Sequence, residues 1–129
     1  METEALISAE LVVIGPHERR LPDGAVLVRD GVIMDVGPRE EMEARAPVGV
    51  TRHDHPDGTL LAGFVDAHVH LALDAGPDPV TALREADDVT VSKGMADRAR
   101  TLLDSGVTTV RDLGDRNGLV VRLRDSVAA

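Results

Sequence analysis

The first third of the chain alternates between polar and apolar residues with the period of extended backbone. Residues 5–14 alternate weakly and end in an apolar run, which predicts one or two short strands, and residues 17–24 form a polar turn. Residues 25–37 hold two apolar runs separated by Asp30 and Gly31. Because an Asp-Gly pair accepts positive φ angles, these runs predict a β-hairpin with a type I′ turn.

The next segment predicts a short helix and a further strand. Pro38 precedes an acidic stretch at residues 39–46, and proline in a first turn with acidic residues near the positive end of the helix dipole favours a helix. Residues 50–55 predict a short strand, and the Pro-Asp-Gly sequence at residues 56–58 predicts a turn.

Three polar residues, Asp66, His68 and His70, occupy every second position within the apolar segment 60–73. This spacing is the strand period, so we expect the three side chains to share one face with Phe64. The other face carries only aliphatic side chains. The segment therefore predicts a strand with one face for chemistry and one for packing.

Histidines at alternate positions of a strand can converge on one divalent cation, because both imidazoles lean the same way and neutral imidazole suits zinc, nickel or iron. Asp66, two residues before His68, would orient a ring or the strand end. The alternative is that His68 and His70 are polar residues at a strand end, satisfied by backbone or water. Burying three neighbouring polar groups is costly unless something satisfies them, which favours the metal site.

Other candidate ligands are expected to lie in solvent. The second His-x-His sequence, His53 and His55, has no apolar flank on either side, so we expect a solvated loop there and equally at His17. A carboxylated lysine could bridge two metal ions, and Lys93 is the lysine of this chain. It lies in a helical stretch, so we expect an exposed ammonium group instead.

Helical and extended patterns alternate after the central segment. Residues 74–79 form a loop, and residues 80–105 show helical spacing with a break expected near residues 89–94. Gly106 is placed to end this helix, and residues 107–113 predict a strand. A last helix would follow, capped by Asn117. This order predicts a βαβ unit with parallel strands.

The composition excludes some classes of binding partner. Its 129 residues fit one ordinary domain, and the net charge of -9 with 1% aromatic residues argues against a nucleic acid or an anionic membrane as partner. The absence of cysteine leaves His and carboxylate side chains as metal ligands. With neither a signal peptide nor a long apolar run in the sequence, we expect a cytoplasmic protein.

Two segments resemble one enzyme superfamily. Residues 60–71, LLAGFVDAHVHL, resemble the first barrel strand of the metal-dependent amidohydrolase superfamily. Residues 105–115, SGVTTVRDLGD, resemble the second strand of its imidazolonepropionase-like and Xaa-Pro dipeptidase-like branch. The two segments have compatible order and spacing, and the similarity extends over nearly the whole chain.

The resemblance implies an α/β fold. Residues 1–57 would be the N-terminal part of a small β-sandwich, and residues 58–129 the first two βα units of a (β/α)8 barrel that is incomplete in this chain. His68 and His70 would bind a divalent metal, which we expect to be Zn2+, with one or two ions in a complete site. Asp112, at the end of the second strand, would contact substrate or orient a ligand, unless it only forms a turn.

The implied activity is hydrolysis of a C–N bond in a small amide, lactam or dipeptide through a metal-activated water. In the superfamily, later strands supply a bridging carboxylated lysine or a glutamate, two further histidines and a catalytic aspartate. Those strands do not fall within these 129 residues, so we expect the chain to be inactive alone. It would be an N-terminal fragment of a hydrolase, a chain completed by a second chain, or a non-catalytic remnant that self-associates as an interaction module.

Overall fold

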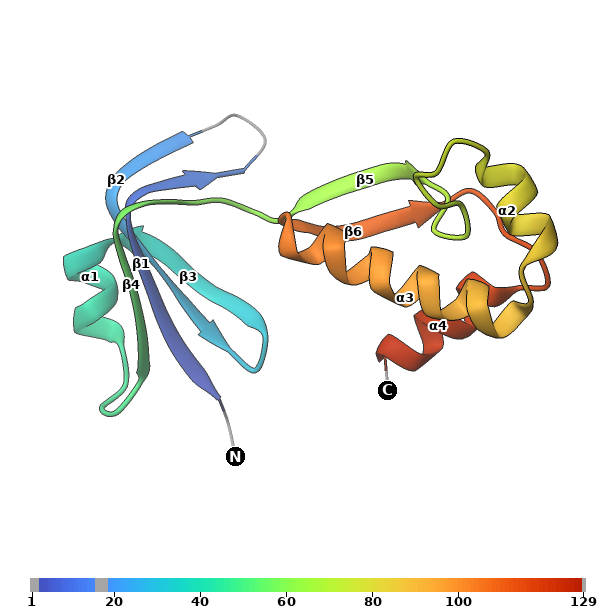
Figure 1. Cartoon of the computed structure of the whole chain (residues 1–129). Helices are drawn as coiled ribbons and strands as arrows, with labels where there is room; N and C mark the ends of the chain where they lie inside the picture. Colours follow the sequence, from blue (N-terminus) through green and yellow to red (C-terminus); the bar gives the residue numbers. More distant parts are fainter. Residues whose placement is uncertain (1–2, 16–18, 129) are drawn as a thin grey trace. The chain divides into compact units, whose positions relative to one another are not determined.

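The computed structural model describes residues 3–15 and 19–128, and the chain divides into two compact units, Met1–Ala62 and Gly63–Ala129 (Figure 1). Each unit has its own sheet and its own hydrophobic core. Among the described residues, no helix has the length and apolarity that crossing a membrane requires.

The first unit contains a four-stranded sheet with the order β3-β2-β1-β4. Its strands are β1 Glu4–Ile14, β2 Arg19–Arg29, β3 Val32–Pro38 and β4 Thr51–Leu60. β1 pairs antiparallel with β2 and parallel with β4, and β2 pairs antiparallel with β3. Asp30 has a φ of 49° and Gly31 a φ of 77°. These two positive angles confirm the hairpin turn predicted between β2 and β3.

The core of the first unit lies between the sheet and one helix. The helix α1 Arg39–Arg45 follows β3 directly and buries Met42, which is 1% exposed, against Leu6 and Ala25. A second cluster on the sheet is formed by small and branched aliphatic side chains, namely Ala9, Val12 and Val26. Burying each large aliphatic side chain contributes about 1.5–3 kcal/mol, so these contacts hold α1 and the sheet together.

The strands of the first unit are longer than the sequence pattern indicated. β1 is one continuous strand, and β2 begins at Arg19, so residues 19–24 belong to a strand and the predicted turn there is wrong. Backbone pairing with β1 holds these polar residues in the sheet, since Arg19 pairs with Ile14. Pairing along a neighbouring strand thus overrides weak local propensity.

β4 continues through the turn predicted at residues 56–58. His55 pairs with Ala9 and Thr59 with Leu11, so the three residues between them form a bulge opposite one residue of β1. β4 is an edge strand, where proline is tolerated. His53 and His55 are exposed as expected, but they lie on this strand rather than in a loop, and His17 lies outside the described residues.

A polar cluster joins the elements of the first unit. Arg39 Nη1 donates to Asp54 Oδ1 at 2.7 Å, and Arg39 Nε donates to Asp23 Oδ1 at 2.6 Å. The Ser8 hydroxyl, which is 5% exposed, donates to the same Asp54 oxygen at 2.8 Å. The hydrogen bond from Arg39, followed by that from Ser8, lowers the pKa of Asp54.

This lowered pKa predicts a loss of stability in acid. The Asp54 contribution is fully present above the unfolded-state pKa, near pH 4, and is lost as the pH falls through the lower folded-state pKa. We expect Asp54→Asn to lower the free energy of unfolding of the first unit at neutral pH. The difference in this free energy between the variant and the wild type should shrink on acidification. Urea unfolding followed by circular dichroism at several pH values measures this. Asp57→Asn, on the same strand, is the control, and an Asp54→Asn deficit independent of pH would contradict the assignment.

The second unit contains a two-stranded parallel sheet, β5 Phe64–Val69 and β6 Val107–Asp112, which confirms the predicted parallel pairing. The helices α2 Pro79–Glu85 and α3 Asp88–Asp104 connect the two strands, and α4 Leu119–Ala128 follows β6. α3 contacts β6 and α4. The core is formed by buried residues of α3, of α4 and of the turn after β5, namely Val91, Met95, Leu119, Leu71 and Ala72.

The helical stretch is interrupted earlier than the sequence indicated. The break lies between α2 and α3, at Ala86 and Asp87, and residues 89–94 lie inside α3. Asp87 is the N-cap of α3, and its side chain accepts a hydrogen bond from Thr90 N at 2.7 Å, which satisfies an amide in the first turn. This hydrogen bond lowers the pKa of Asp87. Gly106, with a φ of 89°, follows the end of α3 as predicted.

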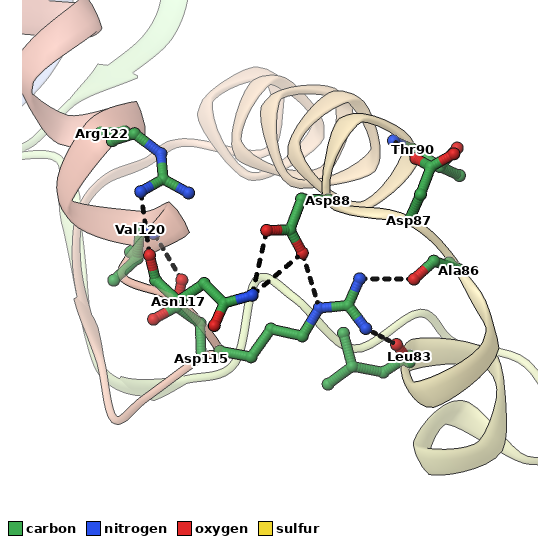
Figure 2. A network of polar contacts seen from close by, with 10 residues as sticks. Leu83, Ala86, Asp87, Asp88, Thr90, Asp115, Asn117, Val120 and Arg122 are labelled. Atoms are coloured by element: carbon green, nitrogen blue, oxygen red, sulfur yellow. Dashed lines mark hydrogen bonds and ion pairs between the residues drawn. The ribbon is translucent and has the colours of Figure 1, made fainter.

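One arginine connects the ends of three elements (Figure 2). Arg116 Nε donates to Asp88 Oδ1 at 2.9 Å, and Arg116 Nη1 donates to the Leu83 carbonyl at 2.5 Å. Arg116 Nη2 donates to the carbonyl of Ala86. The guanidinium group therefore satisfies carbonyls at the end of α2 and binds the first residue of α3 from the loop before α4.

Asp115 caps the start of α4, a role that the sequence pattern assigned to Asn117 (Figure 2). Asp115 Oδ2 accepts a hydrogen bond from Val120 N at 2.7 Å, and Asn117 Nδ2 instead donates to Asp88 Oδ2 at 3.0 Å. Asn117 has a φ of 59°, whereas an N-cap residue adopts an extended conformation. The predicted cap at Asn117 is therefore wrong.

Candidate metal centre

Gly63 brings the beginnings of β5 and β6 into close contact. A Cβ atom at Gly63 would lie 2.2 Å from Thr108 Oγ1 and 2.7 Å from Thr108 Cβ, so the Thr108 side chain occupies the space that a side chain at residue 63 would need. Phe64 N donates to the Gly106 carbonyl at 2.9 Å and starts the pairing. This register brings the carboxyl ends of both strands to the same edge of the sheet.

The two candidate ligands lie next to each other at this edge. His68 lies in β5, and His70 directly follows its last residue. Their ring centroids are 5.5 Å apart, with 72° between the ring planes. Both residues are exposed. The structure thus brings together the two imidazoles that the sequence spacing placed on one face.

Asp66 binds the backbone amide of His68. Its Oδ1 accepts a hydrogen bond from the His68 amide at 3.0 Å. Of the two roles considered for this carboxylate, orienting a ring or the strand end, the contact observed is with the strand backbone.

Asp112 connects the end of β6 to the end of β5. Its Oδ2 accepts a hydrogen bond from Leu71 N, and its Oδ1 accepts one from Gly114 N, both at 2.8 Å. The carbonyl of Gly114 then lies 3.1 Å from His70 Nδ1. Asp112 therefore forms the turn that the sequence left as an alternative, and this turn reaches the candidate ligand.

Arg98 of α3 holds the same segment from another side. Its Nε donates to the Leu71 carbonyl at 2.6 Å. A Cβ atom at Gly94 would lie 3.0 Å from both terminal nitrogens of Arg98, so the absence of a side chain at Gly94 provides space for the guanidinium group. Leu71, the residue after His70, is thus held through its amide by Asp112 of β6 and through its carbonyl by Arg98 of α3.

The donor set fits part of a metal site. Two neutral imidazoles are suitable zinc ligands, and the contact of His70 Nδ1 with a carbonyl leaves its Nε2 available. Catalytic zinc sites generally use three protein ligands. Within residues 3–15 and 19–128, no group of three or more His, Cys, Asp or Glu side chains is placed to hold a metal ion. His68 and His70 therefore fit as two members of a larger ligand set.

Comparison with known proteins identifies the family of the chain. Residues 59–129 match the amidohydrolase family, and residues 24–47 match the imidazolonepropionase-like composite domain of bacteria. The chain belongs to the amidohydrolase family. The histidine pair lies within the region that carries this match, and the superfamily resemblance of both quoted segments is confirmed.

Individual relatives are longer than this chain. An imidazolonepropionase from Haloarcula marismortui is 32% identical over 79% of this chain and 32% of its own length. A 5-methylthioadenosine/S-adenosylhomocysteine deaminase from Desulfovibrio desulfuricans is 32% identical over 98% of this chain and 27% of its own length. The crystal structure of a Xaa-Pro dipeptidase with bound methionine in its active site shares the fold, with a TM-score of 0.78, 21% identity and coverage of 98% of this chain and 30% of that one. The chain thus spans about a third or less of each of these proteins.

Three residues that shape this site have no distinctive sequence signal. Gly114 contributes a backbone carbonyl, which any residue carries, and Arg98 is one of several arginines on a helical pattern. Gly63 precedes an apolar run, a pattern that shows neither its partner strand nor the close approach. Lys93 is exposed on α3, as expected.

Proposed function

We propose that this chain supplies the first two metal ligands of a metal-dependent hydrolase that acts on a C–N bond of a small amide, lactam or dipeptide. The observation that carries the proposal is the adjacent pair of imidazoles, His68 and His70, at the carboxyl end of β5. Enzymes built on parallel strands and helices place their chemistry at this end of the strands. The match of residues 59–129 to the amidohydrolase family supports the same assignment.

Each polar residue of the site has a role in this proposal. His68 and His70 would hold a divalent ion, for which their nitrogen donors favour Zn2+. Such an ion supplies a Lewis acid that activates water and polarises a substrate carbonyl. Asp66 fixes the backbone at His68, and Asp112 fixes the turn beside His70, so the chain's own carboxylates orient the ligands.

The remaining ligands would come from protein outside these residues. In the described part of the chain, β5 and β6 form a two-stranded sheet in which each strand has one unpaired edge. Phe64 is 58% exposed and Val65 is 69% exposed on β5. Open edges and exposed apolar side chains on a sheet favour further strands beside them. A longer polypeptide or a second chain would supply those strands, in keeping with the greater length of the relatives.

Metal analysis of the polypeptide translated from the complete reading frame tests the proposal. We expect about one or two zinc ions per polypeptide and hydrolysis of a small amide, lactam or dipeptide from a substrate panel. Removal of the metal by a chelator should abolish hydrolysis, and added Zn2+ should restore it. A protein without tightly bound metal, whose self-association is indifferent to chelator, would instead support a non-catalytic interaction module.

A further inference from the structure

A closed ring of hydrogen bonds connects the end of β6 to the imidazole of His70. The Asp112 carboxylate accepts hydrogen bonds from the amides of Leu71 and Gly114, and the Gly114 carbonyl contacts His70 Nδ1. His70 and Leu71 are consecutive, which closes the ring. Leu113 N also donates to the Val69 carbonyl at 3.0 Å and extends the strand pairing up to this point. The position of the imidazole is therefore coupled to one carboxylate through a short backbone segment.

The Gly114 carbonyl determines which ring nitrogen carries the hydrogen atom. A carbonyl oxygen only accepts hydrogen bonds, so the nitrogen 3.1 Å away must be protonated Nδ1. The other nitrogen, Nε2, then presents its lone pair. A neutral imidazole without such a partner prefers the opposite tautomer, with hydrogen on Nε2. The contact thus selects the tautomer in which Nε2 can bind a cation.

Gly114, whose carbonyl contacts the ring, has a backbone conformation that favours glycine. Gly114 has a φ of 134°, a conformation that residues with a side chain rarely adopt, and an added Cβ atom would meet nothing within 4 Å. The glycine is therefore required by backbone conformation and not by space. Asp112 holds this conformation by accepting the Gly114 amide, a hydrogen bond to a charged acceptor.

We propose that Asp112 is a positioning residue that holds the Gly114 carbonyl against His70 and thereby keeps Nε2 of His70 available to a divalent cation. This inference rests on the proposed function for the identity of the ligand. The tautomer itself is a property of the chain without metal. The residue acts through Gly114 and does not touch the cation or the substrate.

Two-bond 1H–15N correlation spectra of the metal-free, 15N-labelled chain test the proposal, recorded near pH 8, where an ordinary histidine is neutral. We expect His70 to carry its hydrogen on Nδ1 in the wild type and to shift towards the Nε2–H form in Asp112→Ala. Gly114→Ala disturbs the same carbonyl through the backbone and should give the same shift. His53 and His55, on β4, are internal references in each spectrum.

Asp74→Ala is the matched control. Asp74 Oδ1 accepts a hydrogen bond from the Gly76 amide at 3.0 Å, just as Asp112 accepts one from the amide two residues later. No contact connects Asp74 with Gly114 in the described structure. This variant should leave the His70 tautomer unchanged. A wild type with hydrogen on Nε2 of His70, or a folded Asp112→Ala or Gly114→Ala chain that keeps the Nδ1–H form, would overturn the proposal. Where a variant does not fold, a wild type with hydrogen on Nε2 of His70 would still overturn the proposal.

A titration of the complete protein, translated from the whole reading frame, with Zn2+ separates this proposal from the proposed function. We expect Asp112→Ala to bind Zn2+ about 10–100-fold more weakly than the wild type, the usual cost of losing a group that orients a metal ligand. Asp74→Ala should bind like the wild type. Absence of zinc binding in the wild type with the Nδ1–H tautomer intact would refute the metal site and leave the positioning role of Asp112. Zinc binding unaffected by Asp112→Ala would refute that role and leave the metal site.

Discussion

Replacing His68 or His70 with alanine is expected to abolish high-affinity metal binding and, with it, hydrolysis by the complete protein. Loss of a group that only orients a metal ligand costs about 10–100-fold in affinity, so loss of the ligand itself should cost more than about 100-fold. The adjacent rings of the two histidines at the end of β5 are the basis of this expectation. Competition with a chromogenic chelator measures the affinity, and elemental analysis measures the bound metal.

The chain provides its own control for this experiment. His53 and His55 have the same spacing, lie on strand β4 and are exposed. Their double alanine variant should retain the affinity, the metal content and the activity of the wild type. Equal losses from both histidine pairs would indicate unspecific binding to exposed imidazoles. Unchanged metal content in His68→Ala and His70→Ala would remove the basis of the hydrolase assignment.

Gly63→Ala is expected to destabilise the second unit by about 3 kcal/mol or more, at the upper end of the usual cost of overpacking. The added methyl group would lie 2.2 Å from Thr108 Oγ1, 2.3 Å from Thr108 Cγ2 and 2.7 Å from Thr108 Cβ. Rotation of the Thr108 side chain does not relieve the clash, because Cβ itself is too close. β5 and β6 must therefore separate. With no Trp or Tyr in the chain, urea unfolding is best followed by circular dichroism.

A double-mutant cycle distinguishes this clash from a general effect of the substitution. Thr108→Gly removes all three atoms that the new methyl group would meet, at the cost of a glycine within β6. We expect Gly63→Ala to cost much less in the Thr108→Gly background than in the wild type. Equal costs in both backgrounds would show that the Thr108 side chain does not limit residue 63.

The sequence predicted those parts of the fold whose signal is local. Asp30 and Gly31 indicated the hairpin because both residues accept positive φ, and the observed angles of 49° and 77° agree. The alternation of Asp66, His68 and His70 predicted a strand and placed the two imidazoles together. Each of these inferences required only the period of the backbone or the geometry of one turn.

The parts that the sequence did not predict depend on distant partners. β4 continues past His55 because β1 offers it a further length of backbone to pair with, which no local pattern shows. α3 begins at Asp88 because the Asp87 carboxylate caps it, whereas Gly94 within the helix suggested a later break. Asp112 receives two amides from opposite sides of the strand pair, so its role follows from the pairing of β5 with β6.

Gly94 has a further consequence for α3. A glycine in the middle of a helix costs about 0.5–1 kcal/mol relative to alanine, because it loses more conformational freedom on folding. In return, the guanidinium group of Arg98 rests on the bare backbone one turn away and reaches the Leu71 carbonyl. α3 is thus intrinsically less stable at its centre, and the space at Gly94 lets Arg98 hold the loop that follows His70. Selection for a more stable helix would therefore act against the rigidity of that loop.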